Sequence, residues 1–161
     1  MYIREIHIEN IHNFRAGSRA VRLDLTRPDG SLAGWTVFAG RSAEDKSTLL
    51  RALALSIVGP SAGYALKDSF AEWLHPGAVR GITRARLVPG ESDEFAAGAP
   101  RPRGTFWSGM EWLPLTEISE SFATPIEAEA ATAGPWDEHN AGWFLAGYGP
   151  FRRLGGRALP A

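Results

Sequence analysis

Apolar and polar residues alternate in two short stretches within the first 26 residues. Ile6 and Ile8 alternate with polar neighbours, and so do Val21, Leu23 and Leu25. Successive side chains of a strand point to opposite faces, so this spacing predicts two strands that each bury one face. Turn-forming residues follow both stretches, and we expect the two strands to pair like a hairpin.

The next apolar run, residues 35–39, does not alternate, which is typical of a strand covered on both faces. A polar stretch begins at Gly40, and residues 47–58 are then rich in leucine and alanine up to Gly59 and Pro60. This composition predicts a helix that ends at Gly59. Because the helix is apolar nearly all round, we expect it to be buried.

The remaining chain predicts fewer regular elements. Apolar residues at helical spacing predict a second helix within residues 61–75, stopped by Pro76 and Gly77: Leu66, Phe70, Trp73 and Leu74. Residues 82–88 and 105–113 are predicted to form strands, the second with exposed aromatic side chains. Residues 89–104 are predicted to form a loop or insertion. No structure is assigned to residues 127–134, and residues 142–153 contain a final apolar strand and the segment GYGPFRR.

Composition places these elements in one globular domain of the α/β class, with helices and strands mixed. The 161 residues are 44% hydrophobic and 22% charged, which is ordinary for a folded domain. The net charge of −1 provides no overall attraction to nucleic acid, and the lack of cysteine excludes disulfides and thiolate metal sites. With neither a signal peptide nor a transmembrane stretch recognisable, we expect a cytoplasmic protein without membrane contact.

One motif carries chemistry. A strand, a glycine, a loop, a Lys-Ser pair and a helix follow one another, and Gly40, Lys46 and Ser47 fit the pattern G-x-x-x-x-G-K-[ST]. Such loops bind phosphates because several backbone N–H groups converge at a helix N-terminus. The second glycine of the pattern is Asp45 here. A side chain at this position restricts the backbone, and the Asp45 and Glu44 carboxylates repel a polyanion, so we expect weakened ATP affinity.

The flanking residues add a family resemblance. The opening YIREIHIEN, the following Asn13-Phe14-Arg15, the Phe38-Ala39-Gly40-Arg41 run, Lys46-Ser47-Thr48 and GYGPFRR together resemble the N-terminal lobe of SMC/RecF-like ABC-type P-loop ATPases, which include bacterial AAA family ATP-binding proteins. The resemblance implies one partial ATPase-head domain over residues 1–161 with a mixed sheet. Its parts would be N-terminal strands at 1–26, the Walker A unit at 35–59 and the terminal segment at 142–153.

The resemblance also implies a cofactor and its ligands. ATP and Mg²⁺ would bind, with Lys46 on the β- and γ-phosphates, Ser47 on the metal, Thr48 on the α-phosphate and Arg15 near the nucleotide. The binding loop comprises nine residues: Gly40, Arg41, Ser42, Ala43, Glu44, Asp45, Lys46, Ser47 and Thr48. Residues 42–45 depart from the Asn-Gly-Ser/Ala-Gly of the family.

The Walker B carboxylates, signature motif and switch histidine of that family have no counterpart in the sequence. Without those carboxylates the chain alone is not expected to hydrolyse ATP. The sequence is compatible with three hypotheses: an ATP-binding protein, a non-catalytic pseudo-ATPase that acts as an interaction module, and a truncated product. The partners implied are a second copy or a missing C-terminal half of the head, and DNA through partners. A lobe of this kind would expose apolar surface.

Other candidate residues have simpler interpretations. The four histidines (His7, His12, His75 and His139) share no metal-ligand spacing. Glu111, Glu117 and Glu120 are expected on a solvated face. The tryptophans Trp107, Trp112, Trp136 and Trp143 could stack on bases, but packing is the favoured role because no basic residues accompany them. The arginines Arg152, Arg153 and Arg157 are expected at a solvated end.

Overall fold

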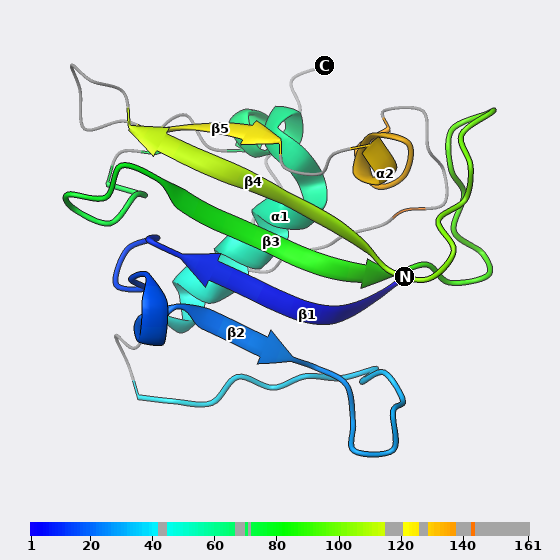
Figure 1. Cartoon of the computed structure of the whole chain (residues 1–161), viewed down its shortest axis with the longest axis horizontal. Helices are drawn as coiled ribbons and strands as arrows, with labels where there is room; N and C mark the ends of the chain where they lie inside the picture. The colour runs from blue at the N-terminus through cyan, green and yellow to red at the C-terminus, as the bar shows by residue number, and fades with distance from the viewer. Residues whose placement is uncertain are drawn as a thin grey trace, which may run out of the picture.

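The computed structural model describes residues 1–41, 45–66, 70, 72–114, 121–125, 129–137 and 143. The helical elements are η1 (Gly17–Arg19), α1 (Lys46–Leu66) and α2 (Glu129–Thr132). The strands are β1 (Tyr2–Glu9), β2 (Val21–Asp24), β3 (Gly81–Val88), β4 (Phe106–Pro114) and β5 (Ser121–Pro125) (Figure 1). Helices and strands thus form an α+β fold, as expected.

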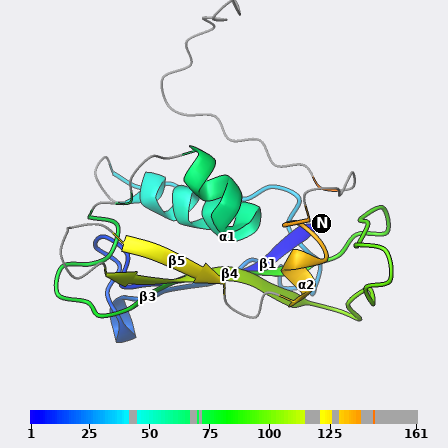
Figure 2. The ribbon, with the colours of Figure 1, turned by 90° about the horizontal axis from the view of Figure 1, so that it is seen from above.

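The five strands form one sheet in the order β2-β1-β3-β4-β5. All four pairings are antiparallel, so the expected mixed sheet is antiparallel throughout the described part of the chain. The predicted β1–β2 pairing is confirmed, with Ile6 opposite Leu23 and Ile8 opposite Val21. Helix α1 lies across one face of the sheet (Figure 2).

The sheet buries the face that α1 covers. Strand β3 alternates strictly, since Gly81, Thr83, Ala85 and Leu87 are buried while the residues between them are partly exposed. Ile6 and Ile8 of β1, Met110 and Trp112 of β4, and Leu49 and Ala52 of α1 belong to one core cluster. The indole Nε1 of Trp112 donates a hydrogen bond of 2.9 Å to the Thr83 hydroxyl, so these two polar groups of the core are paired.

Helix α1 differs from the expectation in two ways. The predicted end at Gly59 is confirmed as a break, with φ 79° and ψ 175°, but helical residues resume and reach Leu66. The helix is also less buried than expected, because Leu50 is 52% exposed and Arg51 lies at the surface. One side of α1 therefore has no cover from the described residues.

The second helix predicted within residues 61–75 is correct only for its first part. Phe70 and Trp73 are buried but not helical, and Glu72 between them has a left-handed φ of 58°. Their rings instead pack against Trp112, with centroids 4.9 and 5.6 Å from it. The helical spacing of these aromatic residues arises in a loop that buries their rings. The periodicity of the sequence cannot distinguish such a loop from a helix.

The strand predicted at residues 35–39 does not form. Trp35 is 91% and Val37 83% exposed, and residues 33–40 make no backbone–backbone hydrogen bond with any described residue. An apolar strand needs a neighbouring strand for its N–H and C=O groups. Residues 33–40 do not pair with the outer edge of β2, and the segment instead runs as extended chain along the β2 side of α1 (Figure 1).

The remaining expectations are mostly confirmed. Residues 89–104 contain no helix or strand, and β3 and β4 match the predicted strands. The aromatics of β4 are more buried than expected, since Phe106 is 8% and Trp112 0% exposed. Helix α2 forms within 127–134, where no structure was assigned. Residues 142–153 lie outside the described residues except Trp143, which is not in a strand.

No helix among the described residues is long and apolar enough to cross a membrane.

Candidate functional site

The Lys-Ser pair of the sequence motif stands at the start of α1. Lys46 is the first helical residue, and the first helical hydrogen bond runs from the Leu49 N–H to the Asp45 carbonyl at 2.8 Å. The Lys46 ammonium group donates to the carbonyl oxygen of Arg41, at the other end of the loop. The lysine therefore spans the loop, while Ser42, Ala43 and Glu44 lie outside the described residues.

Asp45 has a left-handed backbone conformation, which glycine adopts without strain. Its φ is 55°, in the left-handed region that aspartate and asparagine tolerate better than other side chains. The side chain at position 45 therefore does not prevent a positive φ at this position, although it adds a negative charge to the loop.

A contact missed by the sequence analysis ties Asp45 to the turn after β1. The Asn13 side-chain Nδ2 donates a hydrogen bond of 2.8 Å to the Asp45 Oδ2. The turn is closed by reciprocal backbone bonds between Ile11 and Phe14, of 3.0 and 2.9 Å. Asn13 belongs to the Asn-Phe-Arg run of the sequence, so the signal was present, but the pattern named no partner for it.

Unusual backbone conformations gather in the same region. The described residues other than glycine with positive φ are Asn10, His12, Asp45 and Glu72. The turn at 10–14 joins them, because it bonds to Asp45 through Asn13 and to the segment around Trp73 through the His12 N–H. Such conformations cost stability and are concentrated at functional sites, so their grouping here marks the region as a candidate site.

The other residues expected to contact nucleotide differ from one another in the exposure of their side chains. Ser47 is exposed and accessible to a metal ion, whereas Thr48 is 8% exposed. Arg15 is exposed and follows the Asn13 turn by two residues. The part of the expected set that is open to a ligand therefore comprises the helix N-terminus with Lys46 and Ser47, and the exposed Arg15, Gly40 and Arg41.

These groups fit magnesium nucleotide chemically. A lysine ammonium group and the free N–H groups of a helix start bind phosphate oxygens, and a serine hydroxyl is a hard oxygen ligand suited to Mg²⁺. Within the described residues no group of three histidine, aspartate or glutamate side chains could hold a metal on its own. A metal at Ser47 would therefore need phosphate oxygens and water as its other ligands.

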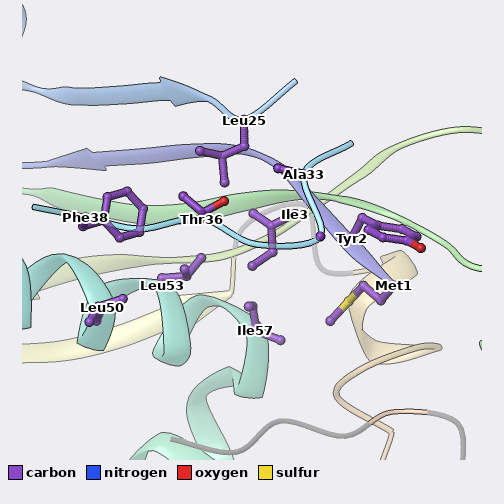
Figure 3. Close-up of a pocket in the computed structure, with 11 residues that line it drawn as sticks. Met1, Tyr2, Ile3, Leu25, Ala33, Thr36, Phe38, Leu50, Leu53 and Ile57 are labelled. Atoms are coloured by element: carbon purple, nitrogen blue, oxygen red, sulfur yellow. The ribbon is translucent and has the colours of Figure 1, made fainter. Parts of the chain in front are cut away.

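A cavity of about 360 Å³ lies between β1, the segment 33–38 and α1. Extended residues Thr36 and Phe38 form one wall, and Ile3, Leu53 and Ile57 of β1 and α1 face them (Figure 3). Most of its lining is apolar. The cavity shows that segment 33–38 packs incompletely on α1, which agrees with the exposed Trp35 and Val37.

A separate polar group on β1 and β3 is centred on His7. The Arg84 Nε donates to the His7 Nδ1 at 3.1 Å, which leaves the ring proton on Nε2, 3.5 Å from Glu9 Oε2. Burial lowers the pKa of His7 from its usual 6.5, and the positive charges of Arg84 and Arg22 act in the same direction against Glu9. A neutral, hydrogen-bonded histidine of this kind has a structural role.

Trp107 beside this group corrects an interpretation made from the sequence. The guanidinium carbons of Arg84 and Arg86 lie 4.4 and 4.7 Å from its ring centroid, so this tryptophan does have basic companions. The other tryptophans pack as expected: Trp112 is buried, and Trp136 and Trp143 donate to the carbonyls of Ile57 and Glu94. Glu111 contacts Arg80, and Glu117 and Glu120 lie outside the described residues.

Comparison with known proteins identifies the fold. No protein-family model matches the chain, and no curated protein matches it in sequence. A solved structure from work on the ATP-driven dimerization and DNA-stimulated activation of SMC ATPases is similar, with a TM-score of 0.50 and 12% identity. The match covers 83% of this chain and 77% of the solved chain. The chain therefore has a fold like that of an SMC ATPase head.

Proposed function

We propose that the protein binds magnesium ATP at the loop of residues 40–48. The observation that carries this proposal is the Lys46 side chain, which begins α1 and spans the loop to the Arg41 carbonyl. The left-handed backbone of Asp45 and the SMC-like fold support it independently. In the bound state Lys46 would exchange the Arg41 carbonyl for β- and γ-phosphate oxygens.

Each residue of the loop has a distinct part in this proposal. Backbone N–H groups between Gly40 and Lys46 would hold the phosphate oxygens, and the hydroxyl of the exposed Ser47 would ligate the metal. Thr48 would approach the α-phosphate, and Arg15 would lie near the nucleotide. The bound metal would neutralise part of the phosphate charge that Asp45 opposes.

Binding without hydrolysis is the proposed outcome for this chain alone. Hydrolysis requires a group that orients the attacking water, and the sequence has no Walker B carboxylate pair. The solved structure with the similar fold comes from SMC ATPases that dimerise with ATP and respond to DNA. We propose by analogy that a second copy or a further part of an ATPase head supplies the missing groups, with DNA contacted through that assembly in the cytoplasm.

A second candidate is a pseudo-ATPase that acts as an interaction module. The observation that favours it is the exposure of three large apolar side chains on either side of the loop in the sequence: Trp35, Val37 and Leu50 are 91%, 83% and 52% exposed. Exposed apolar side chains that form a contiguous surface commonly mark protein interfaces. This function requires the surface and not the loop, so the two candidates respond to different substitutions.

A competition experiment tests the proposal. Labelled ATP is equilibrated with the protein across a dialysis membrane, with and without Mg²⁺, and competed with ATP, pyrophosphate or adenosine. Recognition through Lys46 and Ser47 predicts metal-dependent binding that pyrophosphate displaces and adenosine does not. If the protein retains no ATP but still associates with itself, the interaction module is favoured.

A further inference from the structure

We infer that Asn13 is a positioning residue that holds the Asp45 carboxylate outside the phosphate-binding loop. The inference rests on the proposed function, because it concerns how that loop tolerates an acidic residue. Its observation is the hydrogen bond of 2.8 Å from the Asn13 Nδ2 to the Asp45 Oδ2.

Two consecutive side chains take different directions at the start of α1. Lys46 reaches back across the loop to the Arg41 carbonyl. Asp45 reaches the turn at 10–14, which precedes the loop by about thirty residues and forms no part of it. The carboxylate and the ammonium group therefore have separate partners, and the partner of the carboxylate belongs to another segment of the chain.

The turn that presents Asn13 is held by the core of the domain. Ile11 is fully buried, and the His12 N–H donates to the Trp73 carbonyl at 3.0 Å. Because the turn is fixed on both sides, Asn13 offers its amide at a defined place, and little further ordering is needed to engage Asp45. A rigid partner is what a positioning role requires.

The physical consequence concerns charge near bound phosphates. A carboxylate free to rotate toward the loop would repel a polyphosphate, and this repulsion weakens steeply with distance and solvent exposure. The hydrogen bond keeps the carboxylate at the exposed turn, and it keeps the left-handed conformation of Asp45 occupied. Asn13 thereby acts on nucleotide affinity through Asp45 and without touching the ligand.

The test is a double-substitution cycle with two readouts. Magnesium ATP affinity is measured by titration calorimetry for the full chain, Asn13→Ala, Asp45→Gly and the double variant. Urea unfolding of the same four proteins, without ligand, measures the coupling of the two side chains, because Asn13→Ala and Asp45→Gly each remove the hydrogen bond between them. The conservative Asn13→Ser variant keeps a short hydrogen-bond donor and should restore part of the affinity.

The inference predicts that Asn13→Ala weakens binding about fivefold to tenfold when Asp45 is present. In the Asp45→Gly background the same substitution should leave affinity unchanged, because no carboxylate remains to be held. An equal loss in both backgrounds, no loss in either, or no coupling in the unfolding cycle would overturn the role of Asn13 while leaving nucleotide binding intact. Binding only after Asp45→Gly would overturn both this inference and ATP binding by the natural loop, and binding by no variant would overturn the proposed function itself.

Discussion

The indole of Trp136 lies directly over Gly59, the residue that breaks α1. Its Nε1 donates to the Ile57 carbonyl at 3.0 Å, and a Cβ on Gly59 would lie 2.8 Å from the ring. Gly59 also has φ 79° and ψ 175°, a region occupied almost only by glycine. The tryptophan thus caps the first part of the helix, and it can do so only because residue 59 has no side chain.

Replacing Gly59 by alanine should therefore destabilise the domain. We expect the free energy of unfolding to fall by at least about 2 kcal/mol, from backbone strain and overpacking together. Gly98 is the matched control, because its φ is +85° but an added Cβ would meet nothing within 4 Å. Urea unfolding of both variants should show a loss of about 1 kcal/mol for Gly98→Ala, and equal losses would argue against the Trp136 contact.

The buried His7 predicts a pH dependence of stability. Its pKa is lowered in the folded state by burial and by Arg84 and Arg22, with Glu9 opposing. The unfolded chain therefore binds a proton at His7 first as the pH falls below about 6.5. The contribution of His7 is fully present above that pH and is lost as the pH falls through the lower folded pKa.

Urea unfolding between pH 5 and 8 checks this sign. The free energy of unfolding should decline toward acid in the natural chain, and the decline should be smaller in His7→Gln, which keeps an acceptor for Arg84. A steeper decline in the variant would show that His7 does not have the lowered pKa.

Asp93 should contribute to stability through its contacts with two donors. Its carboxylate is buried, with oxygens 3.1 and 3.0 Å from the Met1 amino group, and it accepts a 2.6 Å bond from the Gly90 N–H. Asp93→Asn removes the charge that these donors share, and we expect a loss of about 1–3 kcal/mol in the free energy of unfolding. The exposed Glu91 supplies the control, since Glu91→Gln should change stability by less than about 0.5 kcal/mol.

The exposed segment at residues 35–37 predicts self-association. Light scattering should show an average mass that rises with concentration, and the Trp35→Ser, Val37→Ser double variant should remain a monomer with an unchanged melting temperature. The same substitution at Val79 is the control, because Val79 is 81% exposed but lies outside this segment. A natural chain that stays monomeric at every concentration would contradict the assignment of this surface as an interface.

The elements that could be predicted from the sequence are those with a local signal. Strands β1, β2 and β3 alternate, and α1 has helix-forming composition with a glycine at its break, so local pattern sufficed. Residues 35–39 have the composition of a buried strand, but a strand also needs a pairing partner, and these residues do not pair with the edge strand β2 or any other described strand. Phe70 and Trp73 have helical spacing, yet their burial is achieved from a loop.

Part of the candidate site could likewise be predicted from the sequence, and part could not. The motif identified Gly40, Lys46 and Ser47 because their spacing is fixed by the loop itself. The Asn13–Asp45 hydrogen bond joins residues 32 positions apart in the chain. Two polar residues so separated leave no periodic signal, and only the fold brings them together. The positive φ of Asp45 likewise gave no clear signal, because aspartate tolerates the left-handed region without requiring it.

Calorimetric titration of the full chain with magnesium ATP, beside Lys46→Ala and Arg51→Ala, tests the central claim most directly. Both substitutions remove one positive charge from the first turns of α1, but only Lys46 spans the loop. We predict that the natural chain and Arg51→Ala bind alike and that Lys46→Ala loses at least about tenfold in affinity, as expected for a charged hydrogen bond. Equal affinities for all three proteins, or no heat of binding for any, would contradict a nucleotide site at this loop.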